Sequence, residues 1–242
     1  MKNFAQHRQA YLQNLFRTID IPEDLATVTD IDTAGEVDPV EADLDPQAVA
    51  ALPLLVSAAR QVGAIQIQTR GTWAGNIVNA SPAADGVAVL MAYDAVVKLE
   101  SKEGVEEIPL SDFYIGYKEM RRIPTQLLTE IRIPRRSYDF EMFEKVGARA
   151  AQAITKVGVA VTRRGKTWRV VTNSVAPTVC RCPALETFLS TGQPAAAPND
   201  LIGPIREDIS PIDDVRSTAR YRETVLARLL YFGLKKDCPS FT

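Results

Sequence analysis

A cluster of small and polar residues between Arg70 and Asp85 is the part of this sequence best suited to binding a ligand. Gly71, Ala74 and Gly75 would let backbone N–H groups approach a bound molecule closely. Hydroxyl and amide side chains stand beside them, at Thr72, Asn76, Asn79 and Ser81. A loop of small residues that leads into a helix is a natural cradle for a phosphate or pyrophosphate. Asp85, at the end of the cluster, could accept hydrogen bonds from ribityl or ribose hydroxyl groups.

The same residues are also compatible with an ordinary tight turn capped by Asn and Ser. Neither of two well-known phosphate motifs is present. The spacing does not match the dinucleotide pattern G-x-G-x-x-G, and no Lys-Ser or Lys-Thr pair follows the glycine as in a P-loop. Spacing alone therefore leaves both a phosphate cradle and a structural turn open.

The composition argues against several other kinds of site. His7 is the only histidine, so a Ser-His-Asp triad or a multi-histidine metal site within this chain is all but excluded. The odd, small number of cysteines (Cys180, Cys182 and Cys238) argues against a disulfide framework. Zinc and iron–sulfur sites usually take about four ligands, so the Cys180-Arg181-Cys182 run is too sparse for either. We expect structural thiols, no metal ligand and no catalytic residue.

Charge and hydropathy indicate a soluble protein. Lys and Arg number 28 against 30 Asp and Glu, so there is no excess of positive charge for nucleic-acid binding. No apolar run approaches the roughly 18 residues of a membrane span, and the N-terminus has no apolar signal-peptide core. We therefore expect a cytoplasmic protein that binds neither nucleic acid nor membrane.

The elements that would position the Arg70–Asp85 cluster mix helix and strand patterns. Residues 1–46 stand apart, because the stretch from 20 to 45 is acidic and shows little periodicity. We expect a helix from Asp45 to near Gly63, an irregular segment over 65–85 and a second helix within 83–95. The later patterns predict strands over 95–101, 106–110, 127–134, 141–147, 153–163 and 168–176.

After Cys182-Pro183 the pattern becomes helical. It predicts a helix over 184–190, a surface linker over 193–200 and a final helix over 217–236. In the final helix, an apolar stripe is expected from residues three and four positions apart: Tyr221, Val225, Leu229 and Phe232.

The fold class predicted from these patterns is α+β, with three parts. An atypical segment covers 1–46, a sheet-and-helix middle domain covers 47–170, and a smaller domain of antiparallel strands packed by helices covers 171–242. The boundary at 170 is approximate. An alternative assigns the strands from about residue 140 to the C-terminal domain.

The string RGTWAGNIVNASPAAD, residues 70–85, resembles the second flavin motif of the medium subunits of the xanthine dehydrogenase and carbon monoxide dehydrogenase family. That motif has Thr or Ser, a variable residue, two glycines and Asn, then a small-Ser-Pro-x-x-Asp run. Further segments resemble the family in the same order: DFYIGYKEM, LLTEIRIP, FEKVGARAAQAITKV, NSVAPTVCRCPALE and DDVRSTARYRETVLARLL. The resemblance covers roughly residues 50–235.

This resemblance implies that FAD is clamped between an N-terminal and a middle subdomain. The residues implied at the pyrophosphate are Thr72, Gly75 and Asn76. Those implied along the ribityl and ring end are Val78, Asn79 and Asp85. Leu128 would pack beside the isoalloxazine, and Lys145 would stand near the polar edge of the ring, where a positive charge favours the reduced, anionic flavin. Structural alternatives remain for three of them: a solvated strand lysine for Lys145, ordinary core for Leu128 and a helix-start carboxylate for Asp85.

The sequence departs from the family pattern at two places. Ala74 replaces the first glycine of the motif, which would cause strain if its φ were positive. The family also has a glycine-rich loop before residue 50, whereas Gly35 is the only glycine before Gly63. About half of the contacts that hold FAD are therefore expected to be absent, and charge-assisted hydrogen bonds contribute about 1.5–3 kcal/mol each.

The resemblance implies an oxidoreductase subunit of the molybdenum hydroxylase type. Electrons would pass from [2Fe-2S] centres through FAD to NAD or another acceptor, with molybdopterin in a large partner subunit and the iron–sulfur centres in a small one. A different hypothesis is a flavin-free docking subunit, in which residues 1–46 have replaced the first flavin subdomain. A third is a truncated gene product, or an FAD site completed by a loop of a partner chain. The retained motif favours the first, and the missing loop favours the second.

Overall fold

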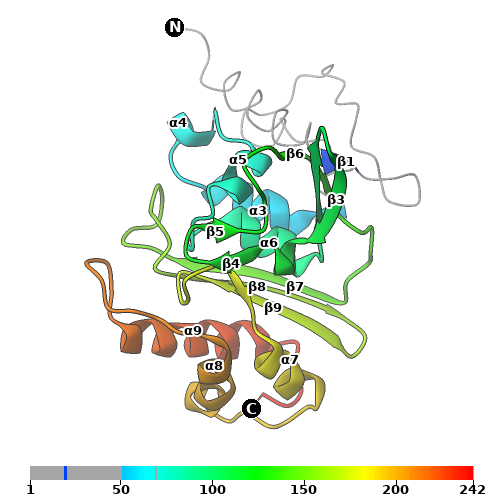
Figure 1. The fold of residues 1–242 in the computed structure, drawn as a ribbon. Helices are drawn as coiled ribbons and strands as arrows, with labels where there is room; N and C mark the ends of the chain where they lie inside the picture. Colours follow the sequence, from blue (N-terminus) through cyan, green and yellow to red (C-terminus); the bar gives the residue numbers. More distant parts are fainter. Residues whose placement is uncertain (1–18, 21–50, 69, 242) are drawn as a thin grey trace, which may run out of the picture.

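The computed structural model describes residues 19–20, 51–68 and 70–241, which form four stacked layers (Figure 1). The first sheet lies outermost, followed by helices α3 and α6, the second sheet, and then helices α7, α8 and α9. Mixed helices and antiparallel sheets confirm the predicted α+β class. The predictions that rest on residues 1–18 and 21–50, including the missing glycine-rich loop, lie outside the described residues.

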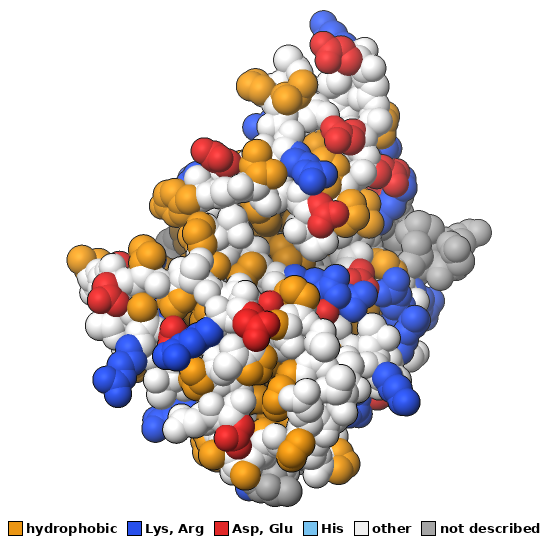
Figure 2. Space-filling model, turned by 60° about the horizontal axis from the view of Figure 1, so that its bottom comes forward, with side chains coloured by type: hydrophobic (Ala, Val, Ile, Leu, Met, Phe, Trp, Pro, Cys, Tyr) orange, Lys and Arg blue, Asp and Glu red, His pale blue; other side chains and the backbone are white. Residues whose placement is uncertain are grey.

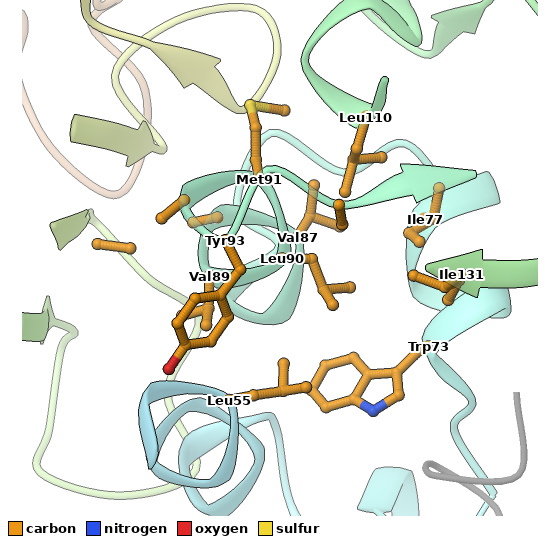
Figure 3. Packing of buried hydrophobic residues seen from close by; sticks show 14 of the residues in the cluster. Leu55, Trp73, Ile77, Val87, Val89, Leu90, Met91, Tyr93, Leu110 and Ile131 are labelled. Carbon is orange, nitrogen blue, oxygen red and sulfur yellow. The ribbon is translucent and has the colours of Figure 1, made fainter. Parts of the chain in front are cut away.

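Helix α6 (Asp85–Ala92) is the centre of the first core, because every one of its residues is buried. A helix that is apolar on all sides needs neighbours on all sides. Figure 3 shows these neighbours around it, among them Leu55 of α3 (Pro53–Gln61) and Trp73 of α5 (Trp73–Val78). A Cβ on Gly86 would lie 1.9 Å from the Trp73 ring, so glycine is required where the indole packs against this helix. The helix predicted within 83–95 is confirmed.

The helix predicted from Asp45 to near Gly63 is described from residue 51 onward: Ala51 is helical, Leu52 interrupts the helix, and α3 begins at Pro53. The predicted start at Asp45-Pro46 lies outside the described residues. Proline suits the first turn of a helix because its missing N–H would have no partner there. The segment predicted to be irregular contains two short helices, α4 (Ile65–Gln68) and α5. Thr72 caps α5, since its Oγ1 accepts a hydrogen bond from Gly75 N at 3.0 Å. Ala74 lies inside α5 and outside the set of residues with positive φ, so the strain considered for it does not arise.

The first sheet has the order β1-β6-β2-β3. Strands β2 (Val96–Ser101) and β3 (Gly104–Pro109) form the predicted hairpin, and β6 (Leu127–Arg132) pairs antiparallel with β2. The two residues of β1 (Ile19–Asp20) pair with β6 in the parallel direction. A short 3-10 turn, η1 (Leu110–Asp112), and the small pair β4 (Tyr114–Gly116) and β5 (Glu119–Met120) connect β3 to β6.

The second sheet is antiparallel, with the order β10-β9-β8-β7. Its strands are β7 (Phe140–Val146), β8 (Val157–Arg164), β9 (Thr167–Asn173) and β10 (Cys180–Arg181). Helix α6 covers one face, and α7 (Pro183–Ser190) and α9 (Ala219–Leu234) cover the other. Both faces of β8 are therefore buried from Val157 to Thr162, unlike a strand with one solvated face.

The C-terminal helices differ from the prediction in two ways. Part of the predicted linker and the residues after it form η2 (Pro198–Leu201) and α8 (Ile202–Asp208). The prediction of which face of α9 is buried was wrong, since Tyr221 is 41% and Phe232 is 63% exposed. The buried residues of α9 are Arg222, Leu226, Ala227, Leu230, Tyr231 and Leu234. Among the described residues, no helix is long and apolar enough to cross a membrane.

Candidate functional site

Asp85 and Lys145, two of the residues implied at the flavin, form a buried ion pair. Asp85 is the first residue of α6 and is 6% exposed, and its Oδ2 accepts a hydrogen bond from Lys145 Nζ at 2.6 Å. Its Oδ1 accepts hydrogen bonds from Thr155 Oγ1 at 2.5 Å and Asn173 Nδ2 at 2.9 Å. A carboxylate has about four acceptor positions, so one position on Oδ2 remains.

The Lys145 ammonium is enclosed rather than solvated, with 8% of its side chain exposed. Besides Asp85, its Nζ donates to the Gln61 carbonyl at 2.8 Å. The alternative of a solvated strand lysine is therefore wrong. The pair links α3, α6 and β7, and Asn173 adds the end of β9. The position of Lys145 at the edge of a flavin ring stays a prediction.

The turn around α5 is open on one side. Thr72, Gly75 and Asn79 are exposed, and Asn76 is half-buried. The Oδ1 atom of Asn76 is buried and has no hydrogen-bond partner in the part of the chain that the structure describes. Such an atom is costly to leave unpaired, so a ligand hydroxyl that donated to it would be favoured.

The end of α5 is tied to the β4–β5 turn. Lys118 Nζ donates to the Asn79 carbonyl at 2.6 Å and lies 3.3 Å from Asn79 Oδ1. Leu128 lies on β6 opposite Leu99 of β2 and is half-buried against the first core. Helix α5, which carries Gly75 and Asn76, packs against both α6 and β6, the strand that carries Leu128.

A cleft of about 280 Å³ lies beside Lys145 and is bordered by α3, α4 and the loop that follows β7. Its lining includes Gln61, Lys145 and Arg149, whereas the α5 residues are not part of it. Arg149 donates to the carbonyls of Ala151 (3.0 Å) and Gln152 (2.7 Å), which shapes the loop. Arg149 is not among the residues implied at the flavin, although it follows Lys145 by four positions within the segment FEKVGARAAQAITKV, which resembles the family.

A second polar link joins α6 to β7 at Tyr93 and Glu141. Tyr93 is fully buried; its hydroxyl donates to Glu141 Oε1 at 2.6 Å and accepts from Leu54 N at 3.1 Å. Burial raises the pKa of the Glu141 carboxyl, and the hydrogen bond from Tyr93 opposes this in part. Burial also raises the pKa of the Tyr93 hydroxyl, so it stays protonated and serves as a donor.

Two family models match the chain, and together they cover most of it. Residues 36–136 match the FAD binding domain in molybdopterin dehydrogenase, and residues 142–236 match the CO dehydrogenase flavoprotein C-terminal domain. The resemblance stated from the sequence motifs is thereby confirmed. No group of three or more His, Cys, Asp or Glu residues suited to a metal ion occurs among the described residues.

Similar proteins are subunits of dehydrogenases. The chain is 27% identical to the 6-hydroxypseudooxynicotine dehydrogenase complex subunit alpha of Paenarthrobacter nicotinovorans, over 76% of this chain and 65% of that protein. It is 34% identical to the caffeine dehydrogenase subunit beta of Pseudomonas sp. (strain CBB1), over 71% and 60%. The chain therefore spans less than two thirds of the length of either relative.

A solved structure shares the fold. Carbon monoxide dehydrogenase from Hydrogenophaga pseudoflava, in a form that lacks the Mo-pyranopterin moiety of the molybdenum cofactor, superimposes with a TM-score of 0.68 at 26% identity. The match covers 77% of this chain and 67% of that chain.

Proposed function

This chain belongs to the family of FAD-binding medium subunits of molybdenum hydroxylases, and we propose that it holds FAD and transfers electrons within a complex of that kind. The observation that carries the proposal is the α5 turn, which keeps the residues of the second flavin motif together. The turn lies within the match to the FAD binding domain, and the C-terminal domain of the flavoprotein follows it.

The residues at α5 fit the cofactor in two respects. The buried Asn76 Oδ1 lacks a partner among the described residues, and a ribityl hydroxyl could donate to it. With the amide turned over, Asn76 would instead present its NH₂ group to a phosphate oxygen. Gly75 is exposed, so its backbone is open to a ligand, and an added Cβ would meet only Thr72 Oγ1, at 2.9 Å.

FAD, when bound, supplies the redox chemistry, and the side chains of this protein position the cofactor and set its electrostatic surroundings. Thr72, Gly75 and Asn76 would hold the pyrophosphate, and Val78 and Asn79 would line the ribityl end. Asp85 would use its remaining Oδ2 position for a flavin hydroxyl.

Lys145 would favour the anionic reduced flavin, but Asp85 neutralises part of its charge. In this proposal Leu128 packs beside the ring from β6. No side chain acts as acid, base or nucleophile.

We further propose that the chain works beside a small [2Fe-2S] subunit and a large molybdopterin subunit in the cytoplasm, and that NAD or another acceptor takes the electrons. Large apolar side chains remain exposed on both halves of the molecule, including Ile115, Tyr117, Ile212 and Val215. On the face shown in Figure 2, apolar side chains lie between the charged ones. Tyr117, Ile212 and Val215 line one hollow of the surface, and contiguous exposed apolar side chains are typical of surfaces that partners cover.

The test is the flavin content of the protein purified with its partners. We expect stoichiometric FAD and a flavin absorbance spectrum in the wild type. Gly75→Asp should remove the flavin without unfolding the chain, because its carboxylate would face the pyrophosphate. Gly75→Ala is the matched control, since it adds the Cβ without the charge. Equal flavin content in wild type and Gly75→Asp would contradict the role of this turn.

The second candidate function is a flavin-free docking subunit of the same kind of complex. Two observations favour it: Asp85 and Lys145 are satisfied by protein groups, and the α5 residues do not line the cleft beside Lys145. If this is the function, the complex should be colourless at flavin wavelengths, should take up no added FAD, and should assemble equally well with Gly75→Asp.

A further inference from the structure

Cys180 and Cys182 place two thiols around a single buried hydroxyl. Cys180 lies on β10 directly opposite Thr172 of β9, and Cys182 precedes the first turn of α7. Thr172 Oγ1 lies 3.3 Å from Cys180 Sγ and 3.5 Å from Cys182 Sγ. Both sulfurs therefore lie on the same side of the strand pair. Neither cysteine is among the residues proposed for FAD, and neither lines the cleft beside Lys145.

The two thiols differ in their exposure. Cys180 is half-buried on β10, which is the edge strand of its sheet, so it is the more accessible residue of the two. Cys182 is 1% exposed and lies behind it in the second core. Cys238, the third cysteine, is also buried, and it follows α9 near the end of the described chain.

The two thiols also differ in their acidity. The hydrogen bond that Cys182 donates to the Cys180 sulfur lowers the pKa of Cys180, with a further contribution from the Thr172 hydroxyl. The same bond and burial raise the pKa of Cys182. Because the thiolate is the nucleophilic form, Cys180 is the thiol that reacts first, and Cys182 is the neighbour that can displace what has been added to it.

We propose that Cys180 and Cys182 form a redox-active dithiol, which hydroperoxides convert to an intrachain disulfide. The Cys180 thiolate attacks a peroxide oxygen, the O–O bond breaks, and Cys180 becomes a sulfenic acid while hydroxide leaves and takes up the proton that the thiol lost. The Cys182 sulfur then attacks the Cys180 sulfur. The S–S bond forms, and the hydroxyl group leaves with the Cys182 proton as water. The sum is two thiols and one hydrogen peroxide giving one disulfide and two waters.

The separation of the two cysteines along the chain is compatible with a disulfide. In a straight strand, residues two apart are separated by about 6.6 Å, just within the upper limit for a disulfide. Cys182, directly after the strand, then turns the chain into α7. Arg181 holds this turn through its ion pair with Glu186, at 2.5 Å between Nη2 and Oε2. The Arg181 side chain is therefore engaged with α7, and both sulfurs lie near the Thr172 hydroxyl.

The experiment uses trypsin, which cleaves after Arg181 and so separates the two cysteines. Full-length protein, alone and in its complex, is treated with hydrogen peroxide, its free thiols are alkylated, and it is digested without reductant. Cys180 lies in the fragment 170–181 and Cys182 in the fragment 182–206. We expect these fragments to run as one species, with the mass of both less two hydrogen atoms, and to separate after reduction.

Three variants test the roles of the individual cysteines. Cys182→Ser should stop the reaction at the Cys180 sulfenic acid, which dimedone would label, and Cys180→Ser should leave Cys182 as a free thiol. Cys238→Ser is the matched control and should form the 170–181 to 182–206 link as the wild type does. The proposal is overturned if wild-type fragments stay separate with both thiols alkylated or over-oxidised, or if Cys180 is linked to Cys238 instead. The wild-type digest decides this even if a variant fails to fold.

Discussion

At the scale of single residues, Asp85 has the most demanding surroundings. Its carboxylate is buried and accepts hydrogen bonds from Lys145, Thr155 and Asn173. Removing one partner of a buried ion pair leaves the other charge uncompensated, which is more costly than losing the attraction itself. The pair therefore constrains α3, α6, β7 and β9 whether or not a cofactor is bound.

We predict that Asp85→Asn lowers the free energy of unfolding by about 3–5 kcal/mol, because Lys145 would stay buried without its counter-charge. Denaturant unfolding followed by circular dichroism measures this change. Glu100→Gln is the control, since Glu100 pairs with Lys98 at the surface and its loss should change stability little. A loss for Asp85→Asn no larger than for the control would contradict a structural role of the pair.

Glu141 leads to a prediction about pH. Burial raises the pKa of its carboxyl in the folded state. Its contribution to stability is therefore fully present below the pKa of the unfolded chain, and it is lost as pH rises through the folded-state pKa. Relative to wild type, Glu141→Gln should gain stability between mildly acidic and neutral pH, because the glutamine cannot ionise.

Urea midpoints of wild type and Glu141→Gln at a series of pH values measure this effect. The amide oxygen introduced by Glu141→Gln can still accept the hydrogen bond from Tyr93, so the variant changes the charge more than the contact. A difference between the two midpoints that stays constant with pH would show that Glu141 does not titrate in this range.

The sequence could predict the residue types of the candidate site but not the contacts that they make. Thr72, Gly75 and Asp85 lie within one short segment, where local spacing is informative. Thr155 and Asn173 contact Asp85 from 70 and 88 residues away. No local pattern records that they share one carboxylate with a lysine of β7. The hydrogen bonds that Asp85 accepts therefore depend on the tertiary fold, which brings these distant residues together.

At the scale of elements, α6 depends on Gly86 for its packing against α5. We predict that Gly86→Ala destabilises the protein by about 1–3 kcal/mol, because the new methyl group must displace the Trp73 ring. Gly203→Ala in α8 is the matched control. Its Cβ would meet nothing within 4 Å, so the helix propensity of alanine should stabilise the chain by up to about 1 kcal/mol.

Thermal unfolding of both variants and the tryptophan emission spectrum measure this prediction. The emission of Gly86→Ala should shift, since the indole of Trp73 moves, while that of Gly203→Ala should not. Equal stability of both variants would mean that the first core can rearrange around the added methyl group at little cost.

Elements with a regular pattern were predictable, and those defined by tertiary contacts were not. The β2–β3 hairpin and the β8–β9 pair follow alternating patterns around the glycine turns at Gly104 and Gly165, and both are confirmed. In α9 the buried stripe, which includes Leu226, Leu230 and Leu234, is shifted by about one position from the predicted one. Arg222 belongs to the buried stripe, although arginine is usually found at the surface. It is 3% exposed, and it donates to the carbonyls of Lys156 and Ser174.

At the scale of the whole molecule, the half that carries the first sheet and the half that carries the second sheet share a core. The first cluster of buried residues includes Phe143, Ala160 and Val171 of the second sheet, because α3 and α6 pack against that sheet. The family models meet between residues 136 and 142, and we propose the domain boundary there, which is the alternative start of the C-terminal domain considered from the sequence. The boundary at 170 would fall inside β9 (Thr167–Asn173), although that division stays a prediction.

A shared core predicts that the two halves unfold together. The two tryptophans report on one half each, since Trp73 packs against α6 in the first cluster and Trp168 of β9 lies in the second. In each of the variants Trp168→Phe and Trp73→Phe, fluorescence of the remaining tryptophan should change at the same denaturant concentration as the circular dichroism signal.

This comparison is made within each variant, so the stability lost through the substitution does not affect it. Neither half can unfold first without exposing apolar surface of the other: loss of α6 would uncover Ala160 and Val171, and loss of the second sheet would uncover one side of α6. If Trp73 fluorescence instead changed at a lower denaturant concentration than the circular dichroism of the same variant, the first half would be an independent unit. The ion pair of Asp85 with Lys145 would then be too weak to couple the two halves.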